Sequence, residues 1–166
     1  VNPTLVPRET PKRERREKHL AAADLLSYAL SEEEIGEVVA AHLVDAYRLD
    51  PEADDATDLR ARACAALLRS GERAASVGAS VEALRYFEQG AELCVVPADE
   101  AAALSRAGEM ALAAGDMERA ISDFDRAAAL YQQSGDTHAT ARATAWLALA
   151  EQRIGRANQV GSRLRG

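Results

Sequence analysis

The sequence has few aromatic residues, few cysteines and no long apolar run. Aromatic residues make up 4% of the 166 residues, with two Phe and one Trp. This scarcity argues against a sheet-based core, which branched and aromatic residues usually fill. The two Cys are 30 positions apart and neither belongs to a CxxC or similar spacing, so no zinc-site signature is present. No apolar stretch approaches the roughly 20 residues of a membrane helix, and no signal peptide opens the sequence. We therefore expect an intracellular, cytoplasmic protein with reduced thiols and no membrane partner.

Alanine is the most abundant residue, with 37 copies. Because alanine is the strongest helix former, the composition predicts an all-α protein with closely packed helices. The length is sufficient for one domain with a real core. Eighteen Arg stand against two Lys, which suggests a GC-rich bacterial genome. Val1 stands where Met is expected, so we expect a fragment, a processed product or a non-standard start.

The net charge of −7 is unevenly distributed. Residues 1–19 and 151–166 each carry +3, whereas residues 20–150 carry −13. An acidic body argues against general nucleic-acid binding, which needs clustered basic residues. The basic run could touch nucleic acid or an acidic partner, but a solvated helix face that includes Glu14 and Glu17 is the simpler interpretation. The run consists of Arg8, Lys12, Arg13, Arg15, Arg16 and Lys18.

The first fifty residues predict a leader followed by two helices. Residues 1–11 hold three of the five prolines and are expected to be extended. Apolar residues at three- and four-residue steps predict a helix over 12–30. Ser31 and Glu34 form a candidate capping box for a second helix, which Pro51 ends. The acidic segment 50–58 is a candidate connector, and helical patterns resume at about Asp58.

Four short breaks divide the rest of the sequence into helices of roughly 15–20 residues. Each break combines a helix stop with a residue that can cap the next helix. Because short turns force neighbouring helices to pack antiparallel, the pattern predicts a series of helical hairpins. The breaks are Gly78 with Ser80, Pro97 with Asp99, Gly115 with Asp116, and Gly135 with Asp136.

The hairpins repeat. Residues 65–93 aligned on residues 102–130 give twelve identities in 29 positions, at an offset of 37. The glycines in the middle of a helix predict a close helix approach, since glycine there costs about 1 kcal/mol against alanine. The Ala is expected to hold the two helices of a hairpin together, and the Phe to fill the space between hairpins. The matched structural positions are Gly71, Gly78, Ala83 and Phe87, then Gly108, Gly115, Ala120 and Phe124.

The pattern G-x-x-A-x-x-x-G-x-x-x-x-A-x-x-x-F-x-x-[GA] resembles the tetratricopeptide repeat (TPR), whose unit is 34 residues. Leu67 and Leu104 replace the family's early Trp, and alanines replace its Tyr. The resemblance implies antiparallel helical hairpins stacked as a right-handed solenoid, with repeats at about 64–97 and 101–135 and a partial unit at 139–166. Gly155 is the expected turn of that last unit, with Val160 where Ala is usual.

Residues 11–135 also resemble part of large bacterial multidomain signalling proteins. In these, a class III adenylate or guanylate cyclase, or a DNA-binding domain, is joined to an AAA- or STAND-type ATPase module and then to TPR repeats. The resemblance implies that residues 12–50 form a helical pair at the junction with the ATPase module, and that residues 58–166 are the first repeats. The sequence contains no GxxxxGK[ST] loop and no cyclase metal-binding aspartate pair, so the resemblance confers no catalysis.

No constellation of residues predicts an enzyme, a cofactor or a metal. The histidines, at 19, 42 and 138, have no paired spacing, and His42 is expected to be a satisfied, partly buried residue. Cys64 and Cys94 are expected to be small buried apolar residues. The acidic segment 50–58 lacks the central Gly and terminal Glu of a calcium loop, which favours a solvated linker.

With no catalytic or metal site predicted, the remaining candidate site is a binding surface on the helices. In TPR arrays the first helix of each hairpin lines a groove that receives a peptide or helix. The resemblance transfers that role to Leu68, Glu72, Ala75, Ser105, Glu109 and Leu112. The Lys and Asn of carboxylate-clamp repeats are absent, so a basic amphipathic segment is the expected ligand, from a protein partner or from the parent protein. Three alternatives remain: an elastic spacer, a small-molecule sensor, and a DNA-engaging or sensing segment of a transcriptional regulator.

Overall fold

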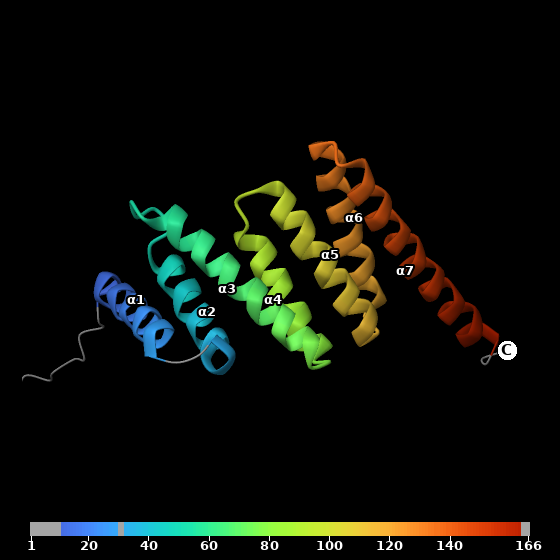
Figure 1. Cartoon of the computed structure of the whole chain (residues 1–166). Coiled ribbons are helices and arrows are strands. Elements are labelled where there is room, and N and C mark those ends of the chain that lie inside the picture. Colours follow the sequence, from blue (N-terminus) through green and yellow to red (C-terminus); the bar gives the residue numbers. More distant parts are fainter. Residues whose placement is uncertain (1–10, 30–31, 164–166) are drawn as a thin grey trace, which may run out of the picture. The chain divides into compact units, whose positions relative to one another are not determined.

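The computed structural model describes residues 11–29 and 32–163, and every regular element in those ranges is an α-helix. The expected leader, except Pro11, and the predicted cap Ser31 lie outside the described residues. The all-α prediction is confirmed for the described chain, which Figure 1 shows with its helices labelled. The helices are α1 (Lys12–Ala29), α2 (Glu32–Leu49), α3 (Ala56–Ser76), α4 (Ser80–Leu93), α5 (Pro97–Ala114), α6 (Met117–Ser134) and α7 (Thr137–Arg163).

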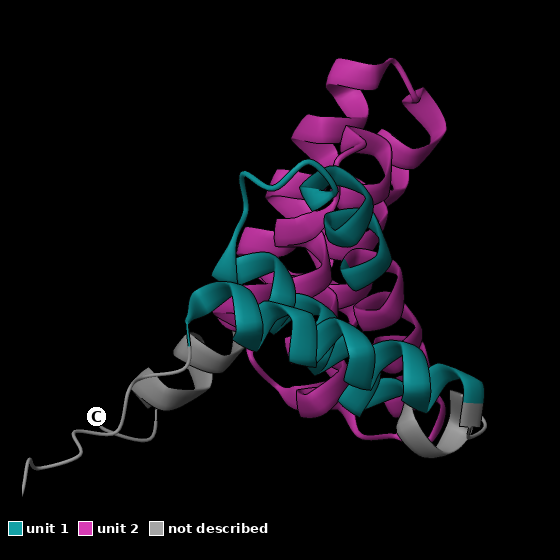
Figure 2. Cartoon of the chain, turned by 90° about the vertical axis from the view of Figure 1, so that its left-hand side faces the viewer, with its two compact units in different colours: residues 1–63 teal, residues 64–166 magenta. Residues whose placement is uncertain are grey.

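The chain divides into two compact units, residues 1–63 and 64–166, which Figure 2 colours separately. In the first unit α1 packs against α2. Ala23 and Ala40 are fully buried there, which shows how small side chains permit close helix packing. Ion pairs join Arg16 to Asp55, and Arg62 to Asp24 with an Nη2 to Oδ1 distance of 2.7 Å. None of the described helices is both long and apolar enough to cross a bilayer.

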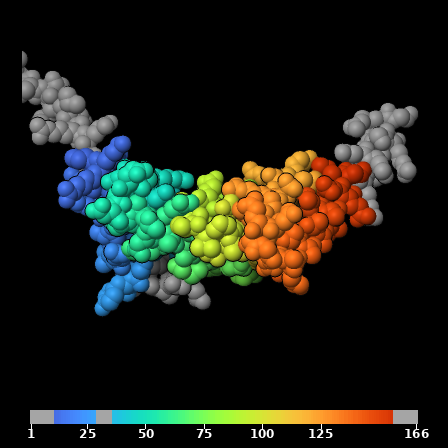
Figure 3. Space-filling model, turned by 90° about the horizontal axis from the view of Figure 1, so that it is seen from above, coloured from blue at the N-terminus to red at the C-terminus, as the bar shows by residue number. Residues whose placement is uncertain are grey.

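In the second unit, consecutive helices pack against each other from α4 to α7. Figure 3 shows the corresponding segments side by side in chain order, from green to red. The buried core between them is built largely of alanine, with Phe87 and Phe124 as its largest fully buried side chains. This composition permits close packing, because alanine on facing helices leaves no bulky side chain to separate them.

The same contact occurs in both hairpins. A Cβ added to Gly71 would lie 2.9 Å from Cε1 of Phe87, and one added to Gly108 would lie 2.8 Å from Cε1 of Phe124. The predicted close approach at both glycines is therefore confirmed. Ala83 and Ala120 are fully buried, as their assigned packing role requires.

The expectation for the two phenylalanines is correct only in part. Each ring packs against the glycine of its own hairpin, so it does more than fill the space between hairpins. Each ring also contacts a later helix: the Arg106 guanidinium lies 5.3 Å from the Phe87 ring centroid, and Trp146 stacks on Phe124 with centroids 6.0 Å apart.

Two of the four predicted breaks have the expected capping chemistry. Gly115 and Gly135 end their helices in the left-handed conformation, with φ of 83° and 76°. Asp116 then accepts a hydrogen bond from the Arg119 amide at 3.2 Å, and Asp136 accepts one from the Ala139 amide at 2.9 Å. Both side chains satisfy amides that the first turn of a helix leaves without partners.

The other two predicted N-caps and the last predicted turn are wrong, whereas Gly78 has the left-handed conformation expected of a helix stop, with φ of 78°. Ala79, not Ser80, is the N-cap of α4, and Val96 is the N-cap of α5, which places Asp99 inside the first turn. Pro97 explains the second shift, because proline is well suited to the first helical position. Gly155 lies inside α7, which continues to Arg163. Neither of the two residues directly after Gly155, Arg156 and Ala157, is of a type that caps a helix. One glycine costs a continuing helix only about 1 kcal/mol.

Candidate functional site

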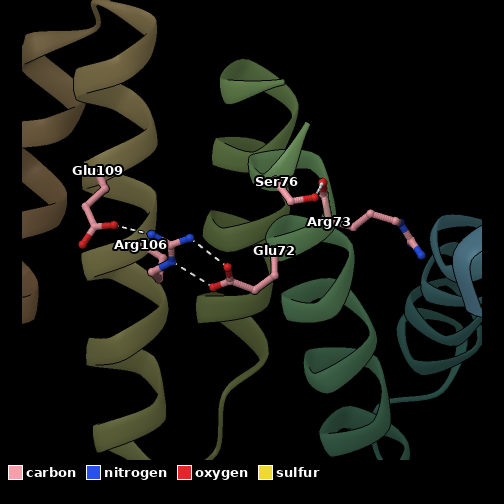
Figure 4. Close-up of polar contacts among 5 residues, drawn as sticks. All are labelled: Glu72, Arg73, Ser76, Arg106 and Glu109. Carbon is pink, nitrogen blue, oxygen red and sulfur yellow. Dashed lines mark hydrogen bonds and ion pairs between the residues drawn. The ribbon is translucent and has the colours of Figure 1, made fainter. Parts of the chain in front are cut away.

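The second unit carries a polar cluster formed by Glu72, Arg106 and Glu109. Figure 4 shows the side chains of Glu72 on α3 and Arg106 on α5 reaching toward each other. Arg106 donates from Nε to Oε1 of Glu72 and from Nη2 to Oε2, both at 2.8 Å. Its third nitrogen, Nη1, donates to Glu109 one turn further along α5. We call these three residues the Glu–Arg–Glu cluster.

Hydrogen bonds and an aromatic contact fix the geometry of this cluster. Two parallel hydrogen bonds from a planar guanidinium fix the carboxylate of Glu72 in orientation as well as in position. The Phe87 ring lies beneath the guanidinium, which adds a cation–π contact. The hydrogen bonds that Arg106 donates to Glu72 and the negative charge of Glu109 raise the pKa of Arg106 above its usual value, against the opposing effect of partial burial. Arg106 is therefore a permanent cation between two carboxylates.

The cluster links two hairpins. Glu72 belongs to the first hairpin, α3 with α4, and Arg106 to the first helix of the next. Glu72 remains 56% exposed and Glu109 30% exposed, so oxygen lone pairs that Arg106 does not use are open to a ligand. With two carboxylates and one guanidinium, the cluster presents a net charge of −1.

The other four predicted groove residues are less available for contact with a ligand. Ser105 and Leu112 are each 8% exposed, and the Ser105 hydroxyl donates to the Ala101 carbonyl at 2.9 Å. Leu68 is half-buried, with its side chain against the backbone of Gly90 on α4. Ala75 is also half-buried. The geometry thus brings Glu72 and Glu109 together through Arg106, while Ser105 and Leu112 pack inside.

Sequence reasoning missed Arg106 and Asp123. Arg106 could have been found from the repeat, because Arg69 occupies the equivalent position one unit earlier. Asp123 on α6 is only 8% exposed, and its Oδ2 makes no hydrogen bond to any described residue. Burial raises the pKa of Asp123 to about 7, and the negative charge of Glu88 acts in the same direction.

Two pairs of reactive residues lie closer together than their sequence spacing indicated. Nδ1 of His19 lies 3.0 Å from Nδ1 of His42, which is half-buried as expected. The Sγ atoms of Cys64 and Cys94 are 2.8 Å apart, and both residues are buried as expected. Among the residues that the structure describes, no group of three or more His, Cys, Asp or Glu is arranged to hold a metal ion.

The basic run begins with Arg8, which lies outside the described residues, and the part of it on α1 forms three ion pairs within its own unit. Arg13 pairs with Glu17 at 3.0 Å, Lys18 with Glu14 at 2.8 Å, and Arg16 with Asp55. These contacts agree with the interpretation of the run as a helix face that includes its own carboxylates. Arg16 and Asp55 also line a concave surface in the first unit, in which acidic residues of the connector outnumber the arginines.

Comparison with known proteins gives no match, either to a family model or to a curated protein.

Proposed function

We propose that this chain is a non-catalytic protein–protein interaction module made of TPR-like hairpins stacked as a right-handed solenoid. On this proposal it is part of a larger bacterial signalling protein of the cytoplasm, of the ATPase–cyclase or ATPase–regulator type. The observation that carries the proposal is the glycine–phenylalanine contact that recurs at an offset of 37 residues. A recurring contact at a fixed period is what a repeat architecture requires, because each unit buries its apolar face against its neighbour.

The Glu–Arg–Glu cluster is the proposed recognition surface. It lies on α3 and α5, the first helices of two successive hairpins, which is where a TPR array binds its ligand. Its net negative charge favours a basic amphipathic segment, either from another protein or from another domain of the parent. Leu68 and Ala75 supply apolar contact beside it, while Ser105 and Leu112 support the groove from inside.

The alternative of a DNA-engaging segment has no comparable support. Phosphate binding needs basic side chains that can release counterions, and three of the basic residues of α1 are already paired with carboxylates. The proposal therefore places the ligand at the second unit.

The test is a pull-down from a lysate of a GC-rich bacterium, with the chain immobilised and bound proteins identified by mass spectrometry. The test variant is Glu72→Lys, which reverses the charge that faces the ligand. The matched control is Glu82→Lys, because Glu82 is similarly exposed at 52% and also pairs with an arginine, Arg85, but lies on α4. Circular dichroism establishes that both variants remain helical.

Capture of the same protein by the wild type and by Glu82→Lys, with loss in Glu72→Lys, would support the proposed surface. The captured protein should contain an exposed basic amphipathic segment. Equal capture by all three proteins would refute the role of Glu72. Capture of nothing by any of them would favour the spacer interpretation.

A further inference from the structure

The two cysteines of the sequence meet at one end of the α3–α4 hairpin. Cys64 lies in α3, and Cys94 is the residue that follows α4 and closes its last turn. The Sγ atoms are 2.8 Å apart, and no disulfide joins them. We propose that Cys64 and Cys94 are a redox-active pair that forms a disulfide between α3 and the end of α4.

The geometry requires little movement for this bond to form. A disulfide has an S–S distance of about 2.05 Å, so the two sulfurs need to approach by less than about 1 Å. The Cys94 amide donates to the carbonyls of Gly90 at 3.0 Å and Ala91 at 3.2 Å, which fixes the backbone at this point. The remaining approach of the two sulfurs, less than about 1 Å, is small enough for side-chain rotation to supply it.

Burial makes the first step of oxidation slow. Cys64 and Cys94 are 8% and 6% exposed, and the hydrogen bond with Cys64, together with burial, raises the pKa of the Cys94 thiol. A thiolate, which is the attacking species, is therefore scarce in the closed structure. In this proposal the oxidant gains access through the connector between α4 and α5, where the neighbouring Val95 and Val96 are 53% and 51% exposed. Opening of this short segment exposes Cys94 without unfolding the hairpin.

The oxidant in this proposal is a low-molecular-weight disulfide, RSSR. One Cys thiolate attacks RSSR, which forms a mixed disulfide on the protein and releases one RSH after proton uptake. The second Cys loses its proton and attacks the protein sulfur of the mixed disulfide, which closes the Cys64–Cys94 bond and releases the second RSH. Two electrons pass from the cysteine pair to RSSR, and a dithiol reverses the reaction.

The disulfide would close a loop that contains all of α4 and most of α3. In the chain-entropy account, a cross-link across about 30 residues reduces the freedom of the unfolded chain enough to raise the folding equilibrium constant by roughly several hundred-fold. The pair would then stabilise the first hairpin of the second unit under oxidising conditions and release it under reducing ones.

The test is exposure of the full chain to excess oxidised glutathione, followed by intact-mass measurement and thermal unfolding. We expect a monomer that has lost the mass of two hydrogens, has no titratable thiol, and unfolds at a higher temperature until dithiothreitol is added. The variants Cys64→Ser and Cys94→Ser should each gain one glutathione and show no such rise.

The wild-type protein alone can overturn the proposal. Three results would each refute a Cys64–Cys94 bond. The first two are a chain that carries two glutathione adducts and a disulfide-linked dimer. The third is that both thiols stay reduced when the oxidation is repeated in a low concentration of urea, which opens the connector. An internal disulfide that leaves the unfolding temperature unchanged would refute the stabilising role.

Discussion

Replacing Asp123 by Asn should remove a large part of the pH dependence of stability. Asp123 lies on α6, is 8% exposed, and has an Oδ2 atom with no hydrogen-bond partner among the described residues. The arginines near it are engaged elsewhere: Arg119 pairs with Glu88 at 3.6 Å, and Arg126 pairs with a glutamate of α5. An ionised Asp123 would therefore be a buried charge with incomplete compensation, which is costly.

The direction and size of the effect follow from the pKa. Burial raises the pKa of Asp123 in the folded protein to about 7 from 3.8, so the folded state holds the proton more tightly than the unfolded state. The stabilisation is fully present below about pH 4 and is lost as the pH rises toward 7. At about 1.4 kcal/mol for each pKa unit, the total loss is on the order of 4 kcal/mol.

Asn has nearly the shape of a protonated Asp and does not ionise. We therefore expect Asp123→Asn to resemble the wild type at about pH 4 and to be more stable by several kcal/mol, up to about 4, at about pH 8. The measurement is the free energy of unfolding in urea, followed by circular dichroism at several pH values. Only the difference between the two proteins is compared, because the ion-paired carboxylates elsewhere impose their own pH dependence on both.

The control is Asp125→Asn, which removes the same charge from an exposed position of the same helix. It separates the effect of burial from that of net charge. A difference between Asp123→Asn and the wild type that stays constant from about pH 4 to about pH 8 would refute the reasoning, because no proton would then be bound differently by the folded and unfolded states.

Two further predictions concern packing and capping. Gly108→Ala should destabilise by roughly 1–2 kcal/mol, because the new methyl meets the Phe124 ring, whereas Gly155→Ala, with nothing within 4 Å, should stabilise by up to about 1 kcal/mol. Equal effects of the two alanines in thermal unfolding would contradict the assigned contact. Asp136→Ala should cost about 1 kcal/mol by loss of a helix cap, whereas Ser80→Ala should be nearly neutral because Ser80 lies inside α4 and no side chain caps this helix at its N-cap, Ala79. A cost at Ser80 similar to that at Asp136 in urea unfolding would show that the cap assignment is wrong.

The helices and most of their breaks could be predicted from the sequence because they depend on local residue types. Alanine content, apolar periodicity and glycine stops act within one or two turns of a helix, so they can be read from a single chain. The predicted turn at Gly155 was wrong for the same reason, since a lone glycine is compatible with either a turn or a continuing helix. The two residues after it, Arg156 and Ala157, are not of a capping type, and that signal could have favoured a continuing helix.

The sequence predicted the two glutamates of the Glu–Arg–Glu cluster but not its arginine. Glu72 and Glu109 occupy equivalent repeat positions, so comparing one repeat with the next finds both. The ion pair between Glu72 and Arg106 instead joins one repeat to the next, across 34 residues rather than the repeat offset of 37. A self-alignment matches Arg106 with Arg69, as it matches Glu109 with Glu72, but it gives no information on which of these side chains bridge two units.

The register of the first hairpin explains why the two cysteines meet. Gly71 and Phe87 lie seven residues before and nine residues after Gly78, and they are in contact. Cys64 and Cys94 lie fourteen before and sixteen after the same glycine, so antiparallel helices of equal rise bring them to the same level. Transferred to the second hairpin, the same register places Ala101 opposite Tyr131, and both are buried in one core cluster. Two side chains of middle size in one hairpin are replaced by a small and a large one in the next, which fill the same space but cannot form a disulfide.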